Sequence, residues 1–139
     1  MSDGSFERVT DSDKRLHGPR TVIFCGFPAK AHPALATLLD MAGLADVAAI
    51  HAVAAQAGET VGTLFQLPGG TGDGVDSDLP RAIIVGGITE KELQRLMGGA
   101  RASRMQPPLW AVLTPASETW TLADLLRELA AERAALSGS

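Results

Sequence analysis

The sequence contains few of the residues that hold disulfide-rich or metal-cluster proteins together. Its 139 residues include one cysteine, no tyrosine, four phenylalanines and two tryptophans. One cysteine can form neither an internal disulfide nor a thiolate metal cluster, which favours a reducing, cytoplasmic location. A single domain of this length buries about two-thirds of its unfolded-chain surface, so an ordinary hydrophobic core is enough for folding.

Charge and hydropathy exclude further classes of protein. The formal net charge is -4, and the sequence has no extended run of lysine and arginine. General nucleic-acid binding and a basic membrane-binding patch are therefore not expected. No stretch approaches the roughly 18 uncharged apolar residues of a membrane span, so we expect a soluble protein.

Composition divides the chain into a tail, one domain and a short end. Residues 1–20 mix both charge signs without the apolar stretch of a signal peptide, so we expect a disordered N-terminal tail. Residues 21–136 carry the periodic patterns of a single domain, and residues 137–139 are predicted to be disordered. Within the domain, residues 68–80 are rich in glycine and aspartate, which is typical of a flexible loop.

Short apolar runs alternate with helical spacings along the domain. Strands are predicted at Val22–Cys25, Val47–Val53, Ala82–Val85 and Leu109–Leu113. Helices are predicted from Pro33 to Gly43, over Thr60–Leu67, around Leu93–Ala100 with an end at Gly98-Gly99, and from Leu122 onward. The predicted strands and helices therefore alternate along the sequence.

Two of the predicted helices share a start signal. Thr89 and Thr121 are each followed three residues later by an acid, Glu92 and Asp124. The threonine side chain can cap the helix while the acid reaches back to the threonine amide, which forms a capping box. We also expect Trp120 to pack on the first turns of its helix as a hydrophobic staple.

Alternating strands and helices with near-continuous apolar strands predict a small layered α/β domain. A roughly four-stranded, mostly parallel sheet would have helices on both faces. The alternative is a ferredoxin-like βαβ-βαβ sandwich. An echo between Val22–Gly26 and Ala82–Gly86 favours a duplication of that kind.

The C-terminal residues resemble a known family. The segment Leu109-Trp110-Ala111-Val112-Leu113-Thr114-Pro115, followed by Trp120-Thr121-Leu122, Leu125-Leu126, Glu128-Leu129 and Glu132, is similar to the uncharacterised bacterial DUF family numbered 3783. The strand Ile83–Val85 with Gly86 is also similar, so the resemblance covers residues 81–133 best. It implies a small bacterial protein of unknown activity, and it supplies no catalytic residues.

The carboxyl ends of parallel strands meet at one edge of a sheet, where ligands of α/β proteins usually bind. That edge would collect Cys25, Gly26, His32, His51, Gly86, Gly87 and Thr114. Cys25 as nucleophile, with His51 or His32 as base, is the sharpest catalytic hypothesis. A lone cysteine at a strand end is more often a small buried hydrophobe, so no catalytic residue is assigned.

Glycine-rich turns at the same edge are candidates for binding a small anion. Gly86-Gly87 precedes Thr89 at a helix start, where free amides and the helix dipole favour negative charge. Gly26 and Thr114 are further candidates.

Metal binding is not predicted. Asp73, Asp76 and Asp78 lack the ligand spacing and the terminal glutamate of a calcium loop. No cofactor is expected either, because the glycine-rich segments lack nucleotide-binding motifs.

Trp110 follows Pro107-Pro108 and is the candidate for contact with a partner protein. No strong catalytic motif is present. The sequence therefore favours a non-catalytic binding or regulatory module that engages a protein partner or a small anionic ligand. The alternative is a small enzyme with a Cys25 nucleophile and a histidine base.

Overall fold

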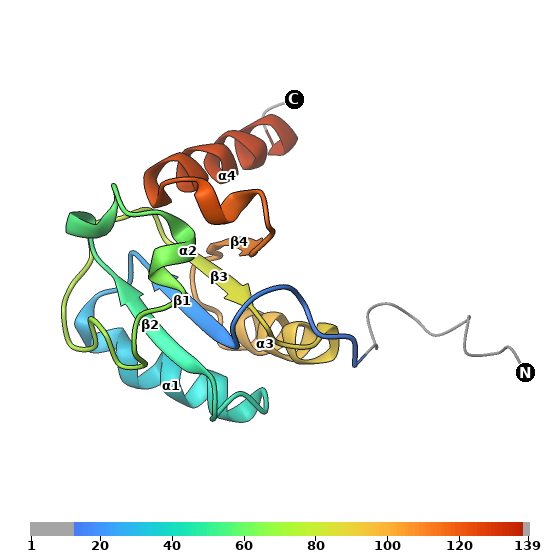
Figure 1. Cartoon of the computed structure of the whole chain (residues 1–139). Coiled ribbons are helices and arrows are strands. Elements are labelled where there is room, and N and C mark those ends of the chain that lie inside the picture. Colours follow the sequence, from blue (N-terminus) through green and yellow to red (C-terminus); the bar gives the residue numbers. More distant parts are fainter. Residues whose placement is uncertain (1–12, 138–139) are drawn as a thin grey trace, which may run out of the picture.

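Four strands form a mixed sheet in the computed structural model, which describes residues 13–137 (Figure 1). The strands are β1 (Thr21–Cys25), β2 (Ala48–Ala52), β3 (Ala82–Gly86) and β4 (Leu109–Val112), in the spatial order β2-β1-β3-β4. The α-helices are α1 (His32–Met41), α2 (Val61–Leu64), α3 (Glu90–Ala102) and α4 (Leu122–Ser137). Each predicted strand is present to within one residue at either end.

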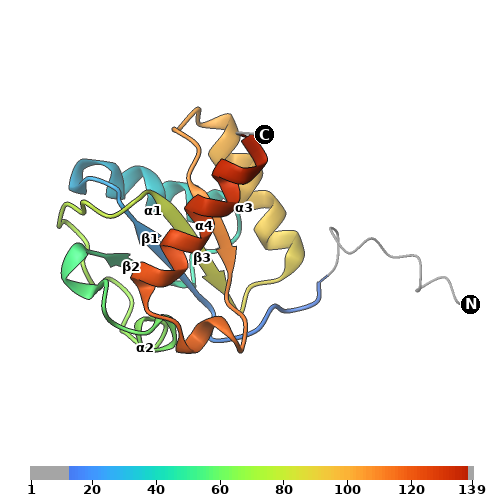
Figure 2. The same ribbon diagram turned by 90° about the horizontal axis from the view of Figure 1, so that it is seen from above.

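Helices cover both faces of the sheet (Figure 2). α1 and α3 lie over one face, and α2 and α4 lie over the other. Side chains alternate along β1, so that Val22 and Phe24 join the core under α1 and α3. Ile23 and Cys25 point the opposite way, into the core under α2 and α4. The predicted small α/β domain is confirmed.

Strand directions overturn the ferredoxin-like alternative. β1 pairs with β2 in parallel and β3 pairs with β4 in parallel, whereas the central pair β1 and β3 is antiparallel. A ferredoxin-like sandwich separates its parallel strands by another strand and keeps its helices on one face. Here the two parallel strands of each βαβ unit are direct neighbours.

The two βαβ units are nevertheless copies of one arrangement. Thr21 pairs with Ala48 in the first unit, and Ala82 pairs with Leu109 in the second, so both members of the pair are shifted by 61 residues. In the central antiparallel pair, Ile23 lies opposite Ile84, which is also 61 residues away. We call positions 61 residues apart equivalent; an approximate two-fold axis relates them.

The backbone follows this equivalence closely between the strands as well. Residues 29–41 are helical in the first unit, as a short 3-10 turn that leads into α1, and α3 spans the equivalent residues 90–102. Gly43 and its equivalent Arg104 both have positive φ, 82° and 61°. Arg104 thus occupies a left-handed helix end that the first unit fills with glycine.

Gly26 and its equivalent Gly87 lie where the backbone of one unit passes close to the backbone that leads into the other. Both have positive φ, and a Cβ at Gly26 would lie 2.8 Å from the Arg81 nitrogen, while one at Gly87 would lie 2.5 Å from the Arg20 nitrogen. Arg20 and Arg81 are themselves equivalent. The similarity between Val22–Gly26 and Ala82–Gly86 therefore reflects a real repeat, but that alignment is shifted by one residue from the structural equivalence.

The segment before β1 is anchored on the second unit. The Leu16 amide donates to the Ile88 carbonyl, and Arg20 binds both Glu92 carboxylate oxygens, at 2.7 and 2.8 Å. Arg20 also binds the exposed Asp46 carboxylate. Residues 14–20 belong to the predicted tail, and their backbone forms hydrogen bonds with the turn into α3. The remaining predicted tail residues 1–12 and the end at 138–139 lie outside the described part.

The helix starts agree with the capping prediction in most respects. Thr89 and Glu92 form the complete capping box. The Thr121 hydroxyl accepts from the Asp124 amide, while the Asp124 carboxylate contacts Arg127. Thr60, the equivalent of Thr121, caps α2 in the same way by accepting from the Thr63 amide.

α3 continues past the glycines at which the sequence predicted its end. A Cβ at Gly99 would lie 2.7 Å from Leu38 Cδ1, and Leu38 is the equivalent position in α1. The two helices therefore meet at the approximate axis, where the glycine makes room for the leucine. Gly98 faces open space apart from a side-chain atom at 3.9 Å.

This contrast predicts opposite effects for two neighbouring substitutions. Gly98→Ala should raise the free energy of unfolding by up to about 1 kcal/mol, because alanine favours helix over glycine. Gly99→Ala gains the same propensity but overpacks Leu38, which costs about 1–3 kcal/mol. Urea denaturation of both variants checks this, and equal stabilisation by the two substitutions would contradict the proposed helix contact.

A second prediction concerns acid. The hydrogen bonds from Arg20 hold the pKa of the Glu92 carboxyl below its usual range. Its contribution to stability is therefore complete above the unfolded glutamate pKa of about 4.3 and is lost as pH falls through the lower folded value. Glu92→Gln keeps a cap acceptor and should cost about 1–2 kcal/mol at pH 7.

In urea denaturation at a series of pH values, the difference between wild type and Glu92→Gln should shrink as pH falls below about 4. Asp46→Asn is the matched control, since the Asp46 side chain is 67% exposed and its pair with Arg20 is screened by solvent. An equal loss in both variants at pH 7 would refute the dominance of the Arg20–Glu92 pair.

Candidate functional site

The mixed sheet places the predicted site residues at opposite ends of its strands. β1 and β2 end on one side of the sheet, with Cys25, Gly26 and His51, whereas β3 ends on the opposite side, with Gly86. The expectation of one shared edge was wrong because β1 and β3 are antiparallel. Gly87 and Thr114 follow β3 and β4 and so lie away from the histidines.

Cys25 does not form a dyad with either histidine. Its side chain is fully buried in the core under α2 and α4, and burial raises the pKa of the thiol to about 12. His51 lies on the opposite face of the sheet, where its ring stacks on Phe24 and on His32. The sheet separates the thiol from both potential bases.

We therefore expect Cys25 to be inert in the folded protein. Iodoacetamide should leave the native thiol unmodified between pH 7 and 9 and modify it after unfolding in urea, as mass spectrometry would show. Rapid labelling of the native chain, with an apparent pKa below the free-thiol value of about 8.5, would restore the catalytic hypothesis.

The candidate anion-binding amides are already paired within the chain. Gly87 donates to the His17 carbonyl at 3.0 Å, and Gly26 donates to Ser77 Oγ at 3.1 Å. The Thr89 amide is bonded to Glu92 in the capping box, and the Thr114 amide donates to Ser117 Oγ. Gly86 pairs with Thr21 in the sheet and lies under the Phe65 ring. These turns are held by the chain itself.

A segment of residues 68–80 lies along the outer edge of β2. The Gly70 amide donates to the Ala49 carbonyl, and the His51 amide donates to the Thr71 carbonyl, each at 2.8 Å. Gly72 passes so close to the His51 backbone that a Cβ would collide with it. The segment contains no helix or strand, as expected. These hydrogen bonds hold it beside β2, and its flexibility remains a prediction.

This segment brings Asp73 to the two histidines. The Asp73 carboxylate lies 3.3 Å from His32 Nδ1, which also accepts a hydrogen bond from the Gly74 amide at 2.9 Å. The rings of His32 and His51 are stacked with their centroids 3.8 Å apart. Sequence reasoning placed both histidines near one edge but missed Asp73, because nothing local predicts that the loop returns over β2.

Both histidines are buried, and one ring nitrogen of His51 lacks a hydrogen bond among the described residues. Relative exposure is 4% for His32 and 8% for His51, and within the described residues His51 Nδ1 has no hydrogen-bond partner. Burial, and then the neighbouring His32, lower the pKa of His51 to about 4, so it is a neutral imidazole at pH 7. A cavity of about 180 Å³ adjoins both rings, Asp73 and Phe24.

The second unit has a hollow at the equivalent place. It has a volume of about 350 Å³ and is lined by Met97, Ala100, Arg101, Met105, Pro107, Pro108 and Trp110. Three of these, Met97, Ala100 and Trp110, are equivalent to Ala36, Leu39 and Ala49 of the histidine cavity. We call it the β4 groove. Trp110, the predicted partner contact, is half-buried in it.

Residues 81–136 match the family model of DUF3783, a domain of unknown function. The resemblance found in the sequence is confirmed. The match begins just before β3 and extends through α3 and β4 into α4, so the segment similar to DUF3783 contains the second unit of the duplication. No curated protein and no solved structure matches the chain. Among the described residues, no helix is long and apolar enough to cross a membrane.

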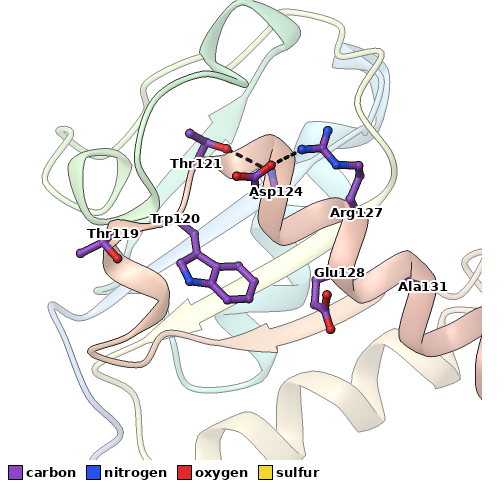
Figure 3. Close-up of a pocket in the computed structure, with 7 residues that line it drawn as sticks. All are labelled: Thr119, Trp120, Thr121, Asp124, Arg127, Glu128 and Ala131. Carbon is purple, nitrogen blue, oxygen red and sulfur yellow. Dashed lines mark hydrogen bonds and ion pairs between the residues drawn. The ribbon is translucent and has the colours of Figure 1, made fainter.

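Another hollow in the matched segment lies beside Trp120 at the start of α4 (Figure 3). The Trp120 side chain and Glu128 lie on the same side of the helix, and the Arg127 guanidinium reaches the Asp124 carboxylate. Trp120 is 39% exposed, so its expected staple covers only part of the ring. Arg127 is paired with Asp124, and Glu128 is a second acidic group in the lining.

Proposed function

We propose that the chain is a non-catalytic protein-binding module whose β4 edge accepts an extended segment of a partner protein. The observation that carries this proposal is the contrast between the outer edges of β2 and β4. The outer edge of β2 is covered by residues 68–80, whereas no part of the chain that the structure describes pairs with the outer edge of β4. The buried thiol and the internally paired turns favour this reading over an enzyme or an anion-binding protein.

The free hydrogen-bonding groups of β4 can be identified from its pairing. Leu109 donates to the Arg81 carbonyl and Leu113 donates to the Val85 carbonyl, so alternate residues of β4 face β3. Trp110 and Val112, which lie between Leu109 and Leu113, therefore direct their N–H and C=O groups away from β3. No backbone hydrogen bond to these groups occurs within the described residues. Such an edge readily pairs with another chain.

The first unit provides the template for the bound partner. Ala49 and His51 are the equivalents of Trp110 and Val112, and they bond to Gly70 and Thr71. Ala131 and Glu132, the equivalents of Gly70 and Thr71, lie in α4. Within residues 13–137, the second unit therefore has no extended segment that pairs with the outer edge of β4. A partner strand would accept from the Val112 amide and donate to the Trp110 carbonyl.

The β4 groove adds side-chain recognition to this backbone pairing. Met97, Met105 and Trp110 offer an apolar pocket, and methionine side chains adapt to irregular ligands. Strand addition gains affinity from the main chain and specificity from pockets for alternate side chains. Arg101 stands among the lining residues, so the partner segment should carry an apolar residue for the pocket and an acidic residue nearby.

The test selects extended peptides against the full chain from a random library and measures their affinity by calorimetry. Val112→Pro removes the edge amide and should weaken binding about 5- to 10-fold, as for one lost hydrogen bond. Trp110→Ala should weaken it about 30-fold or more. Trp120→Ala is the matched control and should leave the affinity unchanged.

Backbone readouts keep the test independent of folding defects. In the wild-type chain, bound peptide should slow hydrogen exchange of the Val112 amide, and N-methylation of the pairing peptide residue should abolish binding. Peptides that bind equally to all three variants would refute the proposal. A stable dimer that becomes monomeric in Val112→Pro would also refute it, by assigning the edge to a second copy.

A further inference from the structure

We propose that His32, His51 and Asp73 form a binding site for a divalent transition-metal ion of the zinc, cobalt and nickel group. The site lies at the β2 edge of the first unit, away from β4. It is independent of the proposed partner binding.

Three separate segments bring the donors together. His32 is the first residue of α1, His51 lies in β2, and Asp73 belongs to the segment that follows the β2 edge. One ligand atom from each lies within 4.8 Å of the other two. Zinc bonds of about 2.0–2.1 Å require donors about 3.3 Å apart, so the donors must move closer together. Because an imidazole binds a metal in the plane of its ring, one of the two stacked rings must also turn out of the stack when the ion binds. The Asp73 side chain is 65% exposed and therefore free to move.

The unpaired nitrogen of His51 points to a ligand. A buried polar atom without a hydrogen bond costs about 1–3 kcal/mol, and native proteins usually satisfy such atoms. Within the described residues, His51 Nδ1 has no partner, while stacking on Phe24 supports the ring. Ligation of a metal ion by this nitrogen would satisfy it.

The donor set selects the class of ion. Two imidazoles and one carboxylate suit zinc and its neighbours, whereas calcium and magnesium prefer a larger set of oxygen ligands. The cavity of about 180 Å³ has room for water as a fourth ligand. His32 Nδ1 would exchange its hydrogen bond from Gly74 for the metal. Binding would therefore tie the segment around Gly74 to α1 and β2.

The second unit shows that the fold does not require these histidines. The equivalents of His32 and His51 are Leu93 and Val112, and the same βαβ arrangement forms around them. Buried imidazoles are therefore a property of the first unit alone. Metal ligation gives them a role that packing does not.

The experiment titrates Co²⁺ into EDTA-treated full chain, follows the visible absorption of bound cobalt, and displaces it with Zn²⁺. One ion per chain with a micromolar or tighter dissociation constant is expected. His51→Val, which introduces the residue of the equivalent position, should weaken binding on the order of 100-fold, and Asp73→Asn at least about 10-fold. His17→Gln and Asp78→Asn are matched controls and should bind as wild type.

Two results would overturn the site: no cobalt uptake at millimolar concentration, or uptake that His51→Val and Asp73→Asn leave unchanged. Equal losses in the His17→Gln control would place the ion elsewhere. Circular dichroism verifies folding, and Asp73→Asn alone decides the question if His51→Val is unfolded, because Asp73 is exposed. In the wild-type chain, Zn²⁺ should shift the Gly74 amide resonance, and an unmoved resonance would count against the ligation of His32.

Discussion

The antiparallel hydrogen bonds between β1 and β3 join the two βαβ units into one sheet. Each unit alone supplies two strands, and a two-stranded sheet is too small to be stable by itself. The buried residues of both cores come from both units, so each core exists only once this pairing has formed. Ile23 and Ile84 face each other at the centre of the sheet, and both are fully buried.

The same pairing determines where chemistry is possible. Because the units run in opposite directions, the polar residues that follow β1 and β2 are separated from those that follow β3 and β4. Where the two units pass close to each other, backbone amides of the turns are already hydrogen-bonded. The turn at Gly87 pairs with the segment before β1, and the turn at Gly26 pairs with Ser77. The turns that resemble anion sites in the sequence are thus part of the connection between the units.

Elements with strong local signals were predictable from the sequence. The apolar runs gave every strand, and the threonine and acid spacing gave the start of α3. Strand direction was not predictable, because an apolar run buried on both faces reads the same in either orientation. The end of α3 was missed for a different reason: Gly99 serves the contact with Leu38, a tertiary effect that overrides local helix propensity. Asp73 was missed because its position depends on backbone bonds to β2.

Equivalent positions separate what the fold needs from what each unit adds. Leu35 and Leu96 are equivalent and both are buried, so an apolar residue there is a requirement of the packing. His51 and Val112 are equivalent but differ in polarity, and the segment that covers the β2 edge is replaced by helix in the second unit. Differences of this kind cannot be explained by the shared architecture. The two units differ most at the outer edges of the sheet, where the cavity beside β2 contains two histidines and the groove beside β4 contains two methionines and a tryptophan.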